Sequence, residues 1–176
     1  MTTKILIAGF GGQGVLFSGK AIAYTGLKCG KEVSWLPSYG PEMRGGTANC
    51  SVTLSDSPIG SPIVDKPDVL IAMNLPSYEK YLQSTEKDGY VIYDSSLIST
   101  KMTREDVKIY GIPASQMAID NGLNGLANMI IMGKFIKETN ALTLDQVKTS
   151  LKSMIPAKKQ ELLEKNIKAI ELGYNF

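Results

Sequence analysis

The chain has 176 residues, of which 43% are hydrophobic and 20% are charged, and its formal charge at pH 7 is +2. These values describe one folded domain over residues 1–176, and they exclude a disordered chain and a strongly basic nucleic-acid-binding protein. With two cysteines and no histidine, the chain can form neither a Ser-His-Asp triad nor a four-cysteine iron–sulfur cluster, and we expect no catalytic residue and no metal site in it.

Strand and helix patterns alternate along the chain as far as Pro113. Short runs rich in β-branched residues predict strands, and two amphipathic stretches predict helices at 14–29 and 75–84. The predicted strands cover residues 4–10, 32–36, 47–54, 68–73, 90–93 and 107–110. This order predicts an α/β fold that begins like a Rossmann fold. It has three layers, α/β/α, and the middle layer is a mostly parallel, mixed sheet.

The pattern beyond Pro113 is helical. Residues 125–136 are apolar around most of a helical circumference, which predicts a central helix with Asn128 as a buried polar group. Thr143 and Gln146 have the spacing of a capping box and predict the start of the next helix. A last amphipathic stretch is expected to end at Gly173. We expect these C-terminal helices, within 125–173, to pack on the sheet.

Neither a secretory signal nor a membrane span is predicted. The apolar run from Ile5 to Ala8 is short and passes directly into a glycine cluster, and no window approaches the ~18 apolar residues of a transmembrane helix. We expect a cytoplasmic protein that binds no membrane and no nucleic acid. Cys29 and Cys50 are expected to be two buried or half-buried thiols without a disulfide.

The glycine cluster between the first strand and the first helix has the spacing G-x-G-x-x-G. Its residues Gly11, Gly12, Gln13 and Gly14 are candidates for holding a phosphate, because such a turn exposes backbone N–H groups at a helix N-terminus. The alternative is that these glycines only let the helix pack tightly. A nicotinamide site also needs an acidic residue at the end of the second strand, and residues 36–39 supply none.

A second unusual segment covers residues 38–47. Its Gly-Pro and Gly-Gly pairs constrain a loop that is expected beside the glycine turn, at the carboxyl edge of the sheet. Arg44 can bind a phosphate or carboxylate, or pair with an acidic group of another chain. A surface loop with only a local Glu42–Arg44 contact is the alternative. The candidate binding residues of this segment are Glu42, Arg44, Gly45, Gly46 and Thr47.

Together these segments resemble the gamma subunit, or gamma domain, of 2-oxoacid:ferredoxin oxidoreductases. The resemblance rests on residues 9–14 and 37–50, with further similarity at 58–70 and around Asn128, and it covers nearly the whole chain. The segment 39–49 is the specific part. Its Pro-Glu-Met-Arg-Gly-Gly-Thr run is more similar to the 2-oxoglutarate or branched-chain type than to the pyruvate type.

The resemblance implies a function in a multisubunit enzyme that converts a 2-oxo acid and coenzyme A to acyl-CoA, CO2 and reduced ferredoxin. It implies thiamine diphosphate and iron–sulfur clusters on alpha, beta and ferredoxin-like delta subunits, ferredoxin as the electron acceptor, and a gamma chain that is inactive alone. The glycine turn and Arg44 then become candidates for contacting the diphosphate of coenzyme A or a neighbouring subunit. A stand-alone dinucleotide-binding protein and a pure assembly scaffold are the alternative hypotheses.

Overall fold

The computed structural model describes residues 1–38 and 47–176 and confirms the α/β fold class. The predicted strands and helices occur in the predicted order, with small shifts at their ends. The elements are β1 (Thr2–Phe10), α1 (Val15–Lys28), β2 (Glu32–Ser38), β3 (Thr47–Ser55), β4 (Val69–Ala72), α2 (Leu75–Leu82), β5 (Tyr90–Asp94), β6 (Lys108–Ile112), α3 (Ala114–Asp120), α4 (Ala127–Thr139), α5 (Leu144–Met154), the 3-10 turn η2 (Ala157–Lys159) and α6 (Gln160–Asn175).

The six strands form one mixed sheet in the order β2-β3-β1-β4-β5-β6. β1, β4, β5 and β6 are parallel, whereas β3 is antiparallel to both of its neighbours, β1 and β2. β3 is therefore the strand that makes the sheet mixed, and the remaining strands give the mostly parallel sheet that the sequence predicts. Because it separates two strands of the same direction, the carboxyl ends of β1, β2, β4, β5 and β6 all lie at one edge of the sheet.

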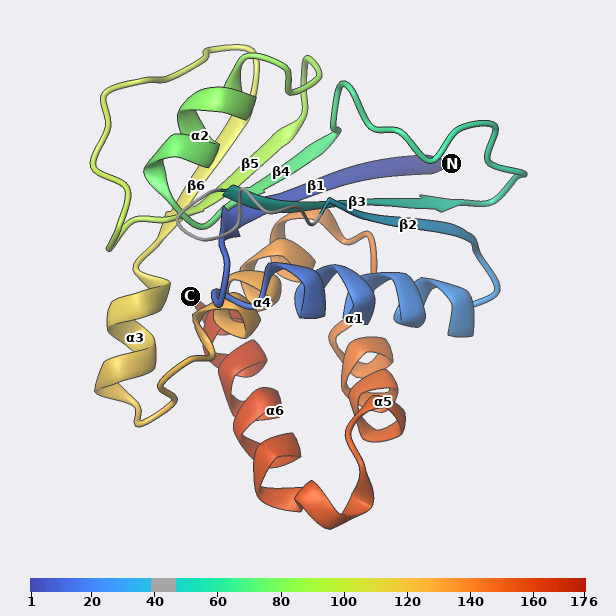
Figure 1. Ribbon diagram of the computed structural model, residues 1–176, viewed down its shortest axis with the longest axis vertical. Helices are drawn as coiled ribbons and strands as arrows, with labels where there is room; N and C mark the ends of the chain where they lie inside the picture. Colours follow the sequence, from blue (N-terminus) through green and yellow to red (C-terminus); the bar gives the residue numbers. More distant parts are fainter. Residues whose placement is uncertain (39–46) are drawn as a thin grey trace.

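Alternating side chains of the strands form a hydrophobic core on each face of the sheet. Ile5 and Ile7 of β1 contribute to the larger core, which includes α1 and α4. Leu6 points to the other face and joins a smaller core with Tyr78 and Leu82 of α2. Figure 1 shows α2 on one side of the sheet and α1 and α4 on the other, with α5 and α6 farther from the strands. Helices therefore cover both faces of the sheet, as expected, and of the C-terminal helices expected to pack on the sheet α4 does so, whereas α5 and α6 pack on other helices.

α4 is the central helix that its apolar sequence predicts. Its residues 128–136 are all buried, because one side of the helix faces the sheet and the other faces α6. α5 packs on α1, and α6 packs on α4. The capping box at the start of α5 is present, since the Thr143 N–H donates to Gln146 Oε1 (2.8 Å) and the Gln146 N–H donates to Thr143 Oγ1 (3.2 Å).

α4 and α6 cross at a pair of glycines. A Cβ on Gly173 would overlap the backbone of Ile130, and a Cβ on Gly133 would overlap the backbone of Ile170. The expectation that Gly173 ends the last helix is therefore wrong, because α6 continues to Asn175. Gly173 is needed inside the helix, where it allows two backbones to touch.

The two cysteines are free, as expected, but only one of them is buried. Cys29 is exposed, contrary to expectation, because it follows the last turn of α1 in a solvent-facing connection to β2. Cys50 of β3 is fully buried, and its thiol donates to the carbonyl of Val15 (3.5 Å). Burial raises the pKa of the Cys50 thiol to about 12.

Because of this raised pKa, we expect Cys50 to make the fold less stable in alkali. The folded protein keeps this thiol protonated while the unfolded chain ionises it from about pH 9. The stabilisation is therefore complete below pH 9 and is lost as the pH rises towards 12. Relative to Cys50→Ala, the wild-type free energy of unfolding should fall by about 1.4 kcal/mol between pH 8 and pH 10 in urea titrations. Parallel pH profiles for the two proteins would contradict this.

We also expect the glycine crossing to be intolerant of a single methyl group. Gly173→Ala should lower the free energy of unfolding by about 1–3 kcal/mol, because the added Cβ forces α6 away from α4. Gly60→Ala is the matched control, since a Cβ at Gly60 meets no atom within 4 Å. Equal urea midpoints for the two variants would show that the crossing has room to relax.

Candidate functional site

The turn formed by residues Gly11–Gly14, here called the Gly turn, joins β1 to α1 at the carboxyl edge of the sheet. Gly12 (φ 89°) and Gly14 (φ 78°) have left-handed backbone conformations, which glycine adopts without steric cost. The Gln13 N–H donates to the Phe10 carbonyl (3.2 Å) and closes the turn. Gly11 and Gly12 are exposed to solvent, while Gln13 and Gly14 are half-buried.

The N-terminus of α1 carries no cap from a side chain. Gly14 is the N-cap residue, and the first turn of the helix contains no acidic residue. The first N–H groups of any α-helix have no partner within the helix, and the helix dipole adds positive potential there. This arrangement suits an anion, which is one of the two interpretations of the glycine spacing.

Gln13 connects the ends of two neighbouring strands. Its Oε1 accepts a hydrogen bond from the Phe10 N–H (2.6 Å), and its Nε2 donates to the carbonyl of Met73 (3.0 Å), just after β4. The side chain therefore holds β1 and β4 together at their carboxyl ends. This structural role explains why a glutamine occupies a turn made otherwise of glycine.

Asn128 of α4 contacts the Gly turn from the opposite side. Its Nδ2 donates to the Gly14 carbonyl (3.2 Å) and to Ser18 Oγ (3.1 Å). A Cβ on Gly14 would overlap this amide, whereas a Cβ on Gly12 would meet no atom within 4 Å. The two interpretations of the glycine motif thus apply to different residues: Gly14 serves packing, and Gly12 leaves the outer face of the turn open.

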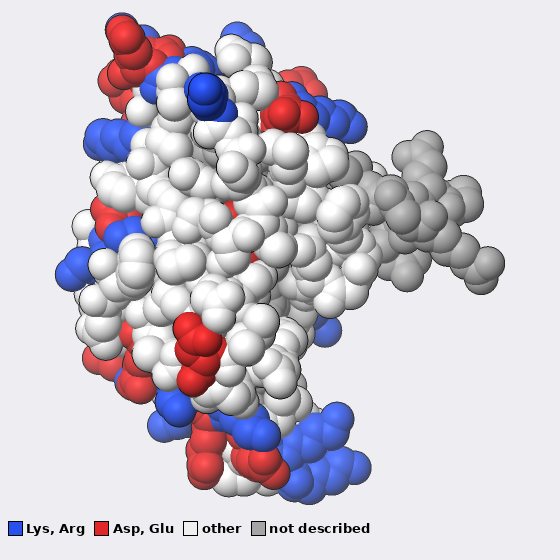
Figure 2. Space-filling model, turned by 90° about the vertical axis from the view of Figure 1, so that its left-hand side faces the viewer, with Lys and Arg blue, Asp and Glu red and all other residues white. Residues whose placement is uncertain are grey.

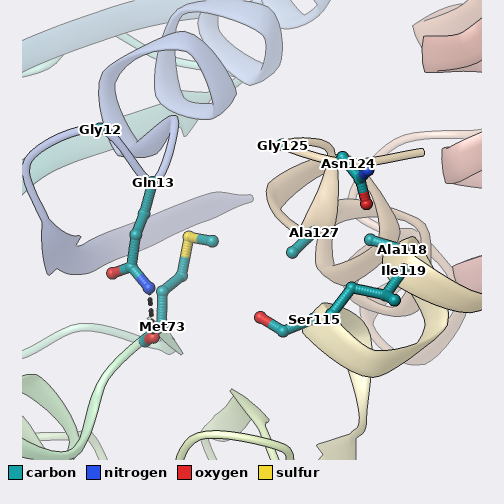
Figure 3. Close-up of a pocket in the computed structure, with 9 residues that line it drawn as sticks. All are labelled: Gly12, Gln13, Met73, Ser115, Ala118, Ile119, Asn124, Gly125 and Ala127. Carbon is teal, nitrogen blue, oxygen red and sulfur yellow. Dashed lines mark hydrogen bonds between the residues drawn. The ribbon is translucent and has the colours of Figure 1, made fainter. Parts of the chain in front are cut away.

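A cavity of about 270 Å³ lies beside the Gly turn. We call it the switch cavity, because it lies at the topological switch point of the sheet, between β1 and β4. α1 leaves β1 towards one face of the sheet and α2 leaves β4 towards the other (Figure 1), which makes this the type of crevice where open α/β sheets bind ligands. Figure 3 shows Gly12, Gln13 and Met73 on one side of the cavity. The other side is lined by Ser115, Ala118, Ile119, Asn124, Gly125 and Ala127.

A buried carboxylate fixes the far wall of the switch cavity. Asp94, at the end of β5, is fully buried, and its Oδ2 accepts hydrogen bonds from the N–H (3.0 Å) and Oγ (2.5 Å) of Ser115. Its Oδ1 accepts from the Ser96 N–H (3.0 Å). Asp94 and Ser115 are not among the residues that the sequence predicts for the site, although an acidic residue at the end of a buried strand is a usable signal.

The segment 38–47 begins and ends at the same edge of the sheet as the Gly turn. Ser38 is the last residue of β2, and Thr47 is the first residue of β3, where it pairs with Phe10. The candidates Glu42, Arg44, Gly45 and Gly46 lie outside the described residues, and for Thr47 only the backbone is described.

The position of β3 argues against a dinucleotide site of the Rossmann type. In such a site an acidic residue ends the strand next to β1 and binds the ribose. Here β3 lies between β1 and β2, so the end of β2 is two strand spacings, about 10 Å, from β1. Even a carboxylate at the end of β2 would be too far from the end of β1 to bind the ribose. This distance is a second argument against a dinucleotide site, in addition to the missing acidic residue.

The described residues contain no group of His, Cys, Asp or Glu side chains arranged to hold a metal ion. None of the helices within residues 1–38 and 47–176 is long and apolar enough to cross a membrane.

Figure 2 looks onto the side of the molecule that carries α3, where uncharged residues dominate the middle of the face. Phe10 of β1, Phe17 of α1 and Ile119 of α3 are exposed hydrophobic residues close to the carboxyl edge of the sheet.

The model of the family described as pyruvate ferredoxin/flavodoxin oxidoreductase matches residues 4–176. The 2-oxoglutarate synthase subunit KorC of Methanocaldococcus jannaschii is 34% identical over 177 residues, which cover 99% of this chain and 93% of KorC. The ketoisovalerate oxidoreductase subunit VorA of Methanothermobacter thermautotrophicus is 36% identical over 171 residues. That match covers 97% of this chain but 35% of VorA, so the chain spans about a third of that relative.

Two solved structures share the fold. The gamma subunit of a keto/oxoacid ferredoxin oxidoreductase from Geobacter sulfurreducens is 26% identical, with a TM-score of 0.83 over 98% of this chain and 96% of that subunit. The 2-oxoglutarate:ferredoxin oxidoreductase of Magnetococcus marinus, solved with 2-oxoglutarate, coenzyme A and succinyl-CoA bound, is 27% identical, with a TM-score of 0.90 over 99% of this chain and 30% of that one. The fold class and the resemblance to the 2-oxoglutarate and branched-chain types are confirmed.

We expect Gln13→Glu to destabilise the fold. The carboxylate keeps an acceptor for the Phe10 N–H but offers no donor to the Met73 carbonyl, which should lower the free energy of unfolding by about 1–3 kcal/mol. Gln83→Glu makes the same chemical change at an exposed position and serves as the control. If urea denaturation gives the same loss for both variants, Gln13 does not connect the two strands.

Proposed function

We propose that this chain, which belongs to the pyruvate ferredoxin/flavodoxin oxidoreductase family of gamma subunits and domains, is the gamma component of a 2-oxoacid:ferredoxin oxidoreductase. The complex converts a 2-oxo acid and coenzyme A to acyl-CoA, CO2 and reduced ferredoxin. The better-matched relatives are named as subunits of a ketoisovalerate oxidoreductase and of a 2-oxoglutarate synthase. We therefore favour a branched-chain 2-oxo acid or 2-oxoglutarate as the substrate.

Within the complex, this chain binds coenzyme A through the Gly turn. The observation that carries the proposal is the open outer face of the turn, where a Cβ on Gly12 meets no atom within 4 Å and the first N–H groups of α1 have no cap. Backbone N–H groups at such a position bind phosphate groups without any charged side chain. The presence of coenzyme A in the related Magnetococcus marinus structure supports the choice of ligand.

The diphosphate of coenzyme A is bound by Gly11, Gly12, Gln13 and Gly14. The binding site extends to the segment between β2 and β3, whose ends lie at the same edge of the sheet. There Arg44 supplies a cation with the fork geometry that matches a phosphate, and the backbone around it supplies further polar groups. The other residues of this assignment are Glu42, Gly45, Gly46 and Thr47.

The redox and carbon–carbon bond chemistry belongs to other chains of the complex. This sequence contains no histidine and only two cysteines, of which Cys50 is buried with a raised pKa. Alpha, beta and ferredoxin-like delta subunits supply the thiamine diphosphate and the iron–sulfur clusters, and ferredoxin accepts the electrons. The uncharged middle of the face in Figure 2 fits a contact with such a subunit, since charged residues are depleted at the centres of stable interfaces.

The test is a pair of glycine variants in the assembled complex. Gly12 (φ 89°) and Gly30 (φ 77°), at opposite ends of α1, both have left-handed backbones, and a Cβ at either one meets no atom within 4 Å. Alanine therefore introduces the same backbone strain at both positions, but only at Gly12 does it obstruct the turn. We expect Gly12→Ala to raise the KM for coenzyme A about tenfold and to leave the KM for the 2-oxo acid unchanged.

Gly30→Ala should leave both KM values unchanged. If Gly12→Ala also leaves the KM for coenzyme A unchanged while the complex still assembles, the chain is an assembly scaffold and the binding proposal is wrong.

A further inference from the structure

The chemistry of the switch cavity differs from that of the Gly turn beside it. None of the nine residues that line the cavity is charged or aromatic. Its polar side chains are the amides of Gln13 and Asn124 and the hydroxyl of Ser115, and the remaining surface is mainly aliphatic. The cavity therefore suits a neutral ligand that has both polar and aliphatic groups.

Coenzyme A extends in two directions from its diphosphate, and the two halves differ in charge and in aromatic character. The nucleotide half carries a doubly charged 3′-phosphate and an adenine ring. The pantetheine half is uncharged and contains two amides, a hydroxyl and a dimethyl group. A cavity without a cation cannot compensate the loss of hydration of a phosphate, and one without an aromatic ring offers adenine no stacking partner.

We infer that the switch cavity holds the pantetheine arm of coenzyme A, which rests on the proposal that the Gly turn binds the diphosphate. A volume of about 270 Å³ lies just below the range for pockets that hold a whole ligand, about 300–1,000 Å³, and so fits an arm of the ligand and not the whole molecule. The arm leaves the Gly turn at Gly12 and runs between Gln13 and α3.

Ser115 and Asn124 are positioned to contact the amides of this arm. The Ser115 hydroxyl donates its proton to Asp94, so its oxygen is left as an acceptor for an amide N–H of the ligand. Asn124 is exposed, and its side chain makes no hydrogen bond to other residues of the described part of the chain. Aliphatic side chains from α3 and the start of α4, such as Ile119 and Ala127, face the dimethyl group.

Both walls of the cavity are held in place before the ligand arrives. On one side Gln13 joins the ends of β1 and β4 through two hydrogen bonds. On the other side Asp94 holds Ser115 through two more, and Figure 3 shows these two walls facing each other. A site with fixed walls binds its ligand without the free-energy cost of ordering them.

The experiment compares the two halves of coenzyme A as competitive inhibitors of acyl-CoA formation by the assembled complex. Pantetheine represents the neutral half, and adenosine 3′,5′-bisphosphate represents the charged half. Ala127→Leu fills the cavity, and Asn124→Ala removes one polar contact at an exposed position where folding is not at risk. Ala157→Leu, in the exposed turn η2, is the matched control for the added volume.

We expect Ala127→Leu to raise the inhibition constant of pantetheine about tenfold or more and Asn124→Ala to raise it about fivefold. The inhibition constant of adenosine 3′,5′-bisphosphate should not change in either variant, and Ala157→Leu should change neither constant. Gly12→Ala should raise the KM for coenzyme A by a larger factor than the inhibition constant of free pantetheine, because pantetheine has no diphosphate to lose contact with the Gly turn.

Other outcomes overturn this inference in distinguishable ways. If Gly12→Ala raises the KM for coenzyme A but the two cavity variants leave the inhibition constant of pantetheine unchanged, the proposed function stands and the assignment of the cavity is wrong. If the cavity variants affect the bisphosphate and not pantetheine, the cavity holds the nucleotide half. A wild-type complex that pantetheine does not inhibit also contradicts the assignment. If none of the variants affects coenzyme A or either inhibitor, the proposed function itself fails.

Discussion

The contact between Asn128 and Gly14 is the constraint on which the carboxyl edge of this sheet depends. One amide group of α4 holds both the carbonyl of Gly14 and the hydroxyl of Ser18, and it occupies the space that any side chain at Gly14 would need. The start of α1 is thereby fixed to the central helix. Because α4 also packs against the sheet and α6, the position of the Gly turn is set by the whole larger core.

Two features of the fold separate this site from a nucleotide site of the ordinary Rossmann type. β3 lies between β1 and β2, which removes the end of β2 from the place where a ribose would be bound. Gln13 joins the ends of β1 and β4, so the crevice between these strands is already bridged at its base. What stays accessible is the outer face of the Gly turn and the neutral cavity beside it.

Local signals in the sequence were sufficient for the elements and for part of the site. The capping box of Thr143 and Gln146 and the glycine spacing of the Gly turn depend on residues close in the chain, and both are present as predicted. Features that depend on distant residues could not be predicted in this way. From the sequence, Gly173 is predicted to end a helix, but it is required because its Cα lies against the backbone of Ile130 in another helix. The link between Asp94 and Ser115 joins residues 21 positions apart, across β6, and has no local pattern.

The place of β1 in the sheet has a consequence for how the chain folds. β1 is the first strand in the sequence but a central one in space, and Ile7 pairs with Cys50 on one side and with Ile71 on the other. During synthesis both edges of this strand stay open until β3 and then β4 have been made, and each pairing closes a long loop of chain. Folding dominated by such distant contacts is slow. A strand with an apolar centre, residues 5–8, and two open edges is meanwhile exposed to aggregation. The nascent chain therefore has most need of protection before residue 72 has emerged.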